Sequence, residues 1–159
     1  MPNSKLLPII INPNPILRKK SVEIKQIQAK QFQQLCLDMG RTMEEKDGVG
    51  LAAPQIGKNI RLIVINTKDG HVCMINPKIT KKSWAKEWGE EGCLSIPNVF
   101  GQVKRHKKIN CEYLDKNGKE IKIIAQGLMA RVIQHEIDHL DGILFIDKTK
   151  IAERITHNF

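Results

Sequence analysis

The feature that most constrains this chain is a short stretch, residues 134–142, which reads QHEIDHLDG. Its two histidines, His135 and His139, are four residues apart, so on a helix both side chains leave the same face. Two imidazoles in this arrangement can bind one metal ion, and Glu136 between them can reach a water on that ion as a general base. Apolar flanking residues indicate that the helix is buried, and buried histidines need partners. The motif therefore predicts a metal centre rather than an exposed helix with two unrelated histidines.

A catalytic metal site needs a third protein ligand and an open position. The longer motif HExxHxxGxxH would supply a histidine, but Phe145 stands at that place. Glu153 follows the motif with little chain left to build a returning helix. Cys93, next to Gly92, is the best upstream choice, because glycine lets the backbone approach closely and mixed nitrogen and sulfur ligands suit ferrous iron or zinc. The alternative is that Cys93 is a plain buried cysteine.

A glycine-rich segment, residues 48–57, reads GVGLAAPQIG. Its beginning matches the dinucleotide-binding pattern GxGxxA, but that pattern requires a preceding strand and a following helix. Here a helical pattern comes before the segment, and Pro54 would interrupt a helix after it. We interpret the segment as an extended wall in which Gln55 is a positioned amide donor.

Hydrophobic periodicity predicts an α+β fold. Apolar residues recur at helical spacing over residues 24–46, which predicts an amphipathic N-terminal helix, and again over residues 128–140. Between the two helices lie short strand-like runs that flank turn signals, at residues 61–66, 72–75, 109–114 and 120–125. Because strands and helices do not alternate regularly, we expect mixed or antiparallel strands packed around the central helix that bears HExxH.

Length and composition fit one domain covering residues 1–159. The chain is 41% hydrophobic and 27% charged, which is typical of a globular protein. No apolar run approaches the ~20 residues of a membrane span. Prolines interrupt the apolar stretch near the N-terminus, and no cleavage site follows it, which argues against a signal peptide. We therefore expect a cytoplasmic protein without a membrane association.

The cysteines predict a reducing compartment. They stand at positions 36, 73, 93 and 111 with no CxxC pair, so we expect single thiols rather than a disulfide scaffold. Cys36 falls on the apolar stripe of the first predicted helix, and Cys111 falls in an alternating strand pattern. Both are expected to be small buried hydrophobic residues.

The chain is basic, with a net charge of +9 and its densest run at residues 104–108, KRHKK. Such a balance suits polyanionic partners such as RNA or the ribosome. A solvated strand face is the simpler explanation of the run, since no nucleic-acid-binding motif accompanies it. Within the run, we expect Arg105 to pair with Asp138, because the helix period turns Asp138 away from the histidine face and a partly buried carboxylate needs a cation.

Three segments together resemble the motifs of the peptide deformylases: GVGLAAPQIG at 48–57, EGCLS at 91–95 and QHEIDHLDG at 134–142. They occur in the family's order and at similar separations. Shorter matches, NPILR at 14–18, NP at 76–77 and GLMAR at 127–131, extend the resemblance over about residues 8–150. The resemblance implies a metal-dependent hydrolase that removes the N-formyl group from the formyl-methionine of nascent polypeptides and releases formate.

The resemblance also implies roles for single residues. Cys93, His135 and His139 would hold one divalent ion, Fe²⁺ in the cell, which Zn²⁺, Ni²⁺ or Co²⁺ can replace. Glu136 would activate the attacking water.

Further roles concern the substrate. Gln55 and the backbone amide of Leu94 would bind the developing oxyanion, and the backbone of Gly50 would contact the peptide. An apolar slot for the methionine side chain is expected from Val49, Leu128 and Val132. The expected partners are nascent formyl-methionyl peptides and the ribosome, and we expect a monomer.

Three alternatives remain open at this point. The same HExxH motif serves metallopeptidases that cleave peptide bonds. A metal-stabilised binding module would leave Glu136 idle, but it requires a closed site with four ligands. An inactive relative would bind RNA through residues 104–108, although all the chemical residues are present.

Overall fold

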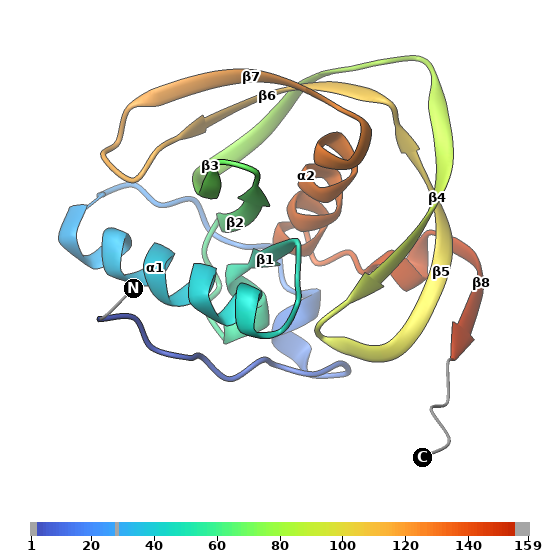
Figure 1. Cartoon of the computed structure of the whole chain (residues 1–159), viewed down its shortest axis with the longest axis horizontal. Helices are drawn as coiled ribbons and strands as arrows, with labels where there is room; N and C mark the ends of the chain where they lie inside the picture. The colour runs from blue at the N-terminus through green and yellow to red at the C-terminus, as the bar shows by residue number, and fades with distance from the viewer. Residues whose placement is uncertain (1–2, 28, 155–159) are drawn as a thin grey trace.

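Two antiparallel sheets and two α-helices make up this computed structural model, which describes residues 3–27 and 29–154 (Figure 1). The larger sheet has five strands in the order β1-β2-β3-β6-β7, and the smaller has three in the order β4-β5-β8. The α-helices are α1 (Ala29–Glu45) and α2 (Gly127–Leu140), and three 3-10 helices are η1 (Pro15–Arg18), η2 (Ala53–Ile56) and η3 (Phe145–Asp147). The strands are β1 (Gly50–Ala52), β2 (Leu62–Thr67), β3 (Gly70–Lys82), β4 (Lys86–Cys93), β5 (Ile96–His106), β6 (Lys108–Leu114), β7 (Glu120–Gln126) and β8 (Thr149–Arg154). The expected α+β class with antiparallel strands is confirmed.

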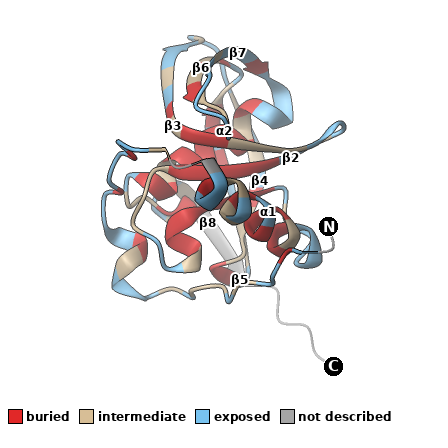
Figure 2. Cartoon of the chain, turned by 90° about the vertical axis from the view of Figure 1, so that its left-hand side faces the viewer, coloured by how far each residue is buried: buried red, intermediate tan, exposed pale blue. Residues whose placement is uncertain are grey.

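Strand β2 separates the two main hydrophobic cores. Because side chains alternate along a strand, Ile63 and Ile65 join the core around α2, while Leu62 and Val64 join the core around α1. All four side chains are buried, and Figure 2 shows buried residues running along this strand. The five-stranded sheet therefore packs a helix on each face, and α2 lies on the inner side, between the two sheets (Figure 1).

Helix α1 begins at Ala29, five residues after the predicted start at residue 24. The backbone of Ile24 is held elsewhere: its N–H donates to Asn76 Oδ1 and its carbonyl accepts from Asn76 Nδ2, both at 2.8 Å. These bonds occupy the groups that a helical turn would use. Within α1, Gly40 lies against the ring of His71, which a Cβ at this position would overlap.

A disulfide joins Cys36 on α1 to Cys73 on β3. The prediction of single thiols is therefore wrong for this pair. The two residues are separated by 37 positions, and their pairing depends on how α1 packs against the sheet, which the spacing of cysteines does not reveal. Cys93 and Cys111 are free, and Cys111 is fully buried on β6.

The hairpin of β4 and β5 was not predicted from the sequence, yet it carries Cys93 at its tip. Strand β4 reads KEWGEEGC, in which charged residues and glycines replace the apolar alternation that marks a half-buried strand. Strand β3 is also longer than the sequence predicted, because it continues to Lys82 instead of ending at residue 75. Among the described residues, no helix has the length and apolar character that a membrane crossing requires.

Candidate metal centre

Helix α2 packs on the five-stranded sheet through Ile133, Ile137 and Leu140. At the helical period, this anchoring turns His135 and His139 away from the sheet, toward the tip of the β4–β5 hairpin. Both histidines are nearly inaccessible to solvent, with exposed fractions of 9% and 1%.

Three ligand-type atoms, one each from Cys93, His135 and His139, lie within 4.8 Å of one another. The sulfur of Cys93 is 3.3 Å from Nε2 of His139, and Nδ1 of His135 is 2.9 Å from Glu91 Oε2. A carboxylate on one ring nitrogen orients a histidine so that the other nitrogen can bind a metal. Two imidazoles and one thiolate form a donor set that fits a divalent ion such as zinc or ferrous iron.

Glu91 is the charged centre beneath these ligands. Its carboxylate accepts two hydrogen bonds from Arg105, from Nε at 2.8 Å and Nη2 at 2.9 Å, and a third from Arg131 Nη1 at 2.9 Å. Burial alone would raise the pKa of Glu91, but its bonds to Arg105 and His135 outweigh burial and hold it well below the ordinary range. The segment EGCLS thus supplies a candidate ligand, Cys93, and the carboxylate that contacts a second candidate, His135.

The predicted pair of Arg105 and Asp138 is confirmed: Nη1 donates to Asp138 Oδ2 at 2.5 Å. Arg105 is only 3% exposed, so it is not one more solvated member of the basic run. The bidentate pair of Arg105, however, is with Glu91, to which Nε and Nη2 both donate. The sequence did not suggest this partner. The guanidinium therefore ties β5 to both β4 and α2.

Glu136 is buried and lies against β1. Burial raises the pKa of its carboxyl to about 7. Among the described residues, its Oε2 has no hydrogen-bond partner. At Gly50, an added Cβ would lie 2.5 Å from Glu136 Oε1, so glycine is required there for the close approach of the two segments. A buried carboxyl with a free oxygen and a pKa near neutrality is suited to accept and return a proton.

The two histidines differ in their electrostatics. Burial and the nearby His135 lower the pKa of His139 well below its usual value, which favours the neutral form that binds metals. For His135, burial works against protonation, but hydrogen bonds to Cys93 and Glu91 outweigh it and raise the pKa to about 10. The two imidazoles therefore differ in the charge state that their surroundings favour.

A cavity of about 450 Å³ opens beside these residues. Gln55 projects into it: Nε2 lies 3.4 Å from Cys93 Sγ and 3.2 Å from Ser95 Oγ, while Oε1 accepts from the N–H of Ala52 at 2.9 Å. The bond to Ala52 fixes the amide so that its NH₂ group faces the sulfur. The predicted site residues that line this cavity are Val49, Gly50, Gln55, Cys93, Leu94, Leu128, Val132, His135 and Glu136.

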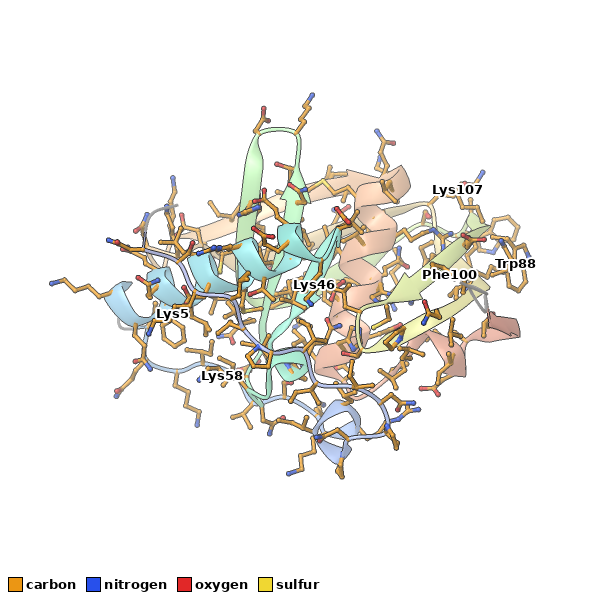
Figure 3. All side chains as sticks on the ribbon, turned by 60° about the horizontal axis from the view of Figure 1, so that its bottom comes forward. Lys5, Lys46, Lys58, Trp88, Phe100 and Lys107 are labelled. Atoms are coloured by element: carbon orange, nitrogen blue, oxygen red, sulfur yellow. A yellow bond between two sulfur atoms is a disulfide. The ribbon has the colours of Figure 1, made fainter. Side chains whose placement is uncertain are left out.

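Other cavity residues were not assigned a role from the sequence. Arg131 lines the wall and donates to Glu91 and to the carbonyls of Val103 and Glu87. Lys46, on the loop after α1, and Phe100, on β5, also line the cavity, and both are labelled in Figure 3. Arg131 belongs to the GLMAR match and Glu91 to EGCLS. Both residues therefore lie in segments that resemble the family, but the sequence did not indicate what either residue does.

Similarity to known proteins extends over nearly the whole chain. The family model described as polypeptide deformylase matches residues 6–154. The chain is 49% identical to a peptide deformylase of Syntrophomonas wolfei over 140 residues, which cover 88% of this chain and 91% of that protein. It is 43% identical to a peptide deformylase of Desulforudis audaxviator, over 92% of this chain and 96% of that one.

Solved structures of peptide deformylases are also similar to this chain. The crystal structure of peptide deformylase from Thermotoga maritima has a TM-score of 0.89 at 37% identity, covering 92% of this chain and 99% of that one. An actinonin-bound peptide deformylase of class I type b from Acinetobacter baumannii has a TM-score of 0.88 at 37% identity, covering 92% and 100%. Since the matched region includes both helices and the cysteine-bearing hairpin, this chain belongs to the polypeptide deformylase family.

Proposed function

We propose that this protein is a metal-dependent peptide deformylase, which hydrolyses the formamide of N-terminal formyl-methionine on nascent polypeptides. The observation that carries the proposal is the convergence of Cys93, His135 and His139 beside Glu136, in a chain of the deformylase family. The products are formate and a free α-amine.

We propose that Cys93, His135 and His139 hold one divalent ion, Fe²⁺ in the cell, with Zn²⁺, Ni²⁺ or Co²⁺ as substitutes. A bound divalent ion supplies Lewis acidity and lowers the pKa of a coordinated water from ~16 toward ~7. Glu91 supports this site, because its contact with Nδ1 of His135 leaves the other ring nitrogen for the ion.

Glu136 acts as the proton carrier. It takes a proton from the attacking water, whose oxygen forms a bond to the formyl carbon. When the carbon–nitrogen bond breaks, Glu136 returns the proton to the departing amine. Its pKa of about 7 suits both steps, because a general base works best when its pKa is near the operating pH.

Gln55 and the backbone amide of Leu94 stabilise the negative charge on the formyl oxygen. Each such donor contributes about 3 kcal/mol in other hydrolases. The backbone of Gly50 binds the peptide. Val49, Leu128 and Val132 form the slot for the methionine side chain, which matches their position on the cavity wall.

The remaining proposals concern the whole chain. Residues 1–159 form one catalytic domain around the helix that bears HExxH, with an amphipathic N-terminal helix beside it. The protein works as a cytoplasmic monomer on nascent chains, and the ribosome is a candidate partner. Residues 155–159 lie outside the part of the chain that the structure describes.

The decisive experiment measures formate release from formyl-Met-Ala by protein prepared anaerobically with iron, together with the metal content of the same sample. We expect metal-dependent formate release and no cleavage of unformylated Met-Ala. Cleavage of the peptide bond instead would support the metallopeptidase alternative, and metal binding without turnover would support the binding module.

The metal ligand is tested separately by alkylation. We expect added metal to slow alkylation of Cys93 at least tenfold, because a coordinated sulfur is a poor nucleophile. Cys111, which is buried on β6, is the internal control and should show no such dependence on metal. Equal rates for Cys93 with and without metal would contradict its role as a ligand.

A further inference from the structure

A corner of the molecule away from the metal centre gathers positive charge. We call it the lysine corner and define it as residues 81–86, where β3 passes into β4, and residues 104–108, where β5 passes into β6. Neither segment contains an acidic residue. Its exposed lysines are Lys81, Lys82, Lys86, Lys104, Lys107 and Lys108.

An exposed tryptophan stands at the turn of this corner. Trp84 has 98% of its surface accessible to solvent. Its neighbours are nevertheless fixed: Ser83 N–H donates to the Lys108 carbonyl at 2.8 Å, and Lys107 N–H donates to the Ala85 carbonyl at 3.0 Å. The indole ring therefore projects from a backbone that is held in place on both sides, and little order has to be imposed when a ligand stacks on it.

The second tryptophan of the chain, Trp88, lies next to this corner on β4. Trp88 is opposite Lys104 in the β4–β5 register, with the ammonium of Lys104 5.8 Å from the ring centroid. Trp88 is 45% exposed, and Figure 3 shows it at the same end of the molecule as Lys107. Lys82, Lys86 and Lys104 also line a hollow of about 320 Å³, which Asp138 and Asp141 line as well.

None of the six lysines of the corner forms an ion pair within the described part of the chain. Arg105 differs from them, because Glu91 and Asp138 bind its guanidinium inside the fold. The exposed positive charge therefore comes from flexible ammonium groups around two aromatic rings. Aromatic rings that stack on bases, next to cations that bind phosphates, are the features that bind single-stranded nucleic acids.

We propose that the lysine corner binds single-stranded RNA, with a base stacked on Trp84 and phosphates on the surrounding lysines. RNA is the favoured source because its loops and ends present unstacked bases, whereas cellular DNA is mainly paired. A duplex is the less favoured form, because its bases stay stacked on one another and offer no free face to the exposed indole of Trp84. A membrane surface fits poorly, because the neighbours of the two tryptophans in sequence are serine, alanine, lysine, glutamate and glycine, without other large apolar side chains.

The corner is separate from the metal centre. Along β4, Lys86 precedes Cys93 by seven residues, which corresponds to about 23 Å of strand. None of the residues that line the cavity of the metal centre belongs to the corner. RNA bound here leaves that cavity open, so this inference does not depend on the proposed deformylase activity.

The test uses the full chain and a fluorescein-labelled single-stranded RNA of about 12 nucleotides, followed by fluorescence anisotropy at several salt concentrations. We compare K82E/K86E/K104E with K5E/K58E/K116E, a control of equal charge whose three lysines are exposed and lie outside the corner. Figure 3 shows Lys5 and Lys58 away from Lys107. Trp84→Ala is compared with Trp84→Phe, which keeps an aromatic face. The circular dichroism spectrum and urea unfolding of each variant verify that the fold is intact.

We expect the corner triple variant to lose binding and the control triple to keep it within about threefold. Trp84→Ala should weaken binding about tenfold, and Trp84→Phe should restore most of it. Variants that lack one or two of the corner lysines should show a weaker salt dependence. The slope of log affinity against log salt concentration should become less negative by about 0.7 for each phosphate that the protein no longer binds. Since Trp84 lies in the corner and Trp88 lies beside its Lys104, RNA should also quench the intrinsic fluorescence of the protein.

Several results would overturn the proposal. Equal losses in the two triple variants would mean that net charge alone attracts RNA. Unchanged affinity in Trp84→Ala would contradict stacking of a base on this ring. Equal affinity for a duplex of the same sequence would contradict it too, because the bases of a duplex are not free to stack on the protein. Binding to single-stranded DNA without RNA, or to phosphatidylserine vesicles without RNA, would assign the corner to a different partner.

Discussion

The two helices of this protein are attached to the sheets by different kinds of interaction. Helix α1 lies on β2 and β3 through apolar side chains such as Phe32 and Met39, with the disulfide of Cys36 and Cys73 in the same seam. Helix α2 also packs on apolar residues, but its other side is tied to the β4–β5 hairpin by the charged network of Glu91.

The apolar contacts of α1 serve stability, whereas the charged network beside α2 serves the candidate metal centre. An apolar seam stabilises in proportion to the area it buries and tolerates changes that preserve volume. A buried charged network costs desolvation, and it depends on every partner being present. The network lies directly under the candidate metal ligands, where it orients His135. Changes in the network should therefore reach the metal, whereas changes in the seam should affect stability alone.

Glu136→Gln should reduce formate release by about 10³-fold, because an amide cannot accept the proton of the attacking water. Metal content should be unchanged, since Glu136 is not one of the proposed ligands. Turnover and metal content are measured on the same sample, with Glu120→Gln on exposed β7 as the control. Turnover close to that of the wild type would show that the assigned base is wrong.

Glu91→Gln tests the charged network itself. Replacement of the carboxylate leaves Arg105 and Arg131 without their shared counter-charge, so we expect a loss of about 3 kcal/mol or more in the free energy of unfolding. Metal affinity should fall about tenfold or more, because His135 loses its orienting partner. Urea unfolding and metal titration measure the two effects.

The neighbouring substitution Glu90→Gln is the matched control for Glu91→Gln. Glu90 lies on the same strand but is exposed, so its replacement should change stability by less than ~0.5 kcal/mol. Similar losses in both variants would mean that general charge on β4, rather than the network, stabilises this region.

The apolar seam is tested by reducing the disulfide. Opening the cross-link frees a loop of 37 residues in the unfolded chain, and we expect the free energy of unfolding to fall by about 2 to 3 kcal/mol. C36A/C73A should be insensitive to reductant. Thiol titration of the denatured protein should find two free thiols before reduction and four after it. Four free thiols without reductant would contradict the cross-link.

The same comparison explains what the sequence could predict. Apolar periodicity located α2, β2 and the β6–β7 hairpin, because those elements bury one regular stripe or face. The start of α1 was misplaced because Asn76, far away in sequence, binds the backbone of Ile24. The disulfide was missed for the same reason, since it depends on tertiary packing.

For the candidate site, too, some residues could be predicted from the sequence and others could not. The histidines of α2 were predicted from helical geometry, and Cys93 from its glycine neighbour and from family resemblance. The β4–β5 hairpin that positions Cys93 was not predicted, because its residues are charged or glycine. Glu91 lay within a recognised motif, but its role depends on a register that sets β4 against β5 and α2.

The smallest effect is expected at the edge of the network, where Asp138 lies between two cations. Arg105 binds it from inside the fold with 3% of its side chain exposed, whereas Lys148 approaches at 2.9 Å with 41% exposed. Water and salt screen the exposed pair, so a double-mutant cycle of Lys148→Ala with Asp138→Asn should give a coupling below ~0.5 kcal/mol.

The same cycle with Arg105→Lys should give a larger coupling, about 1 kcal/mol, since lysine keeps the charge but cannot hold Glu91 with two bonds and Asp138 with a third. Both cycles use urea unfolding, and they share Asp138→Asn, so errors in that variant cancel in the comparison. Equal couplings would mean that Asp138 is screened on both sides. In that case the buried network ends at Glu91, and Asp138 belongs to the surface.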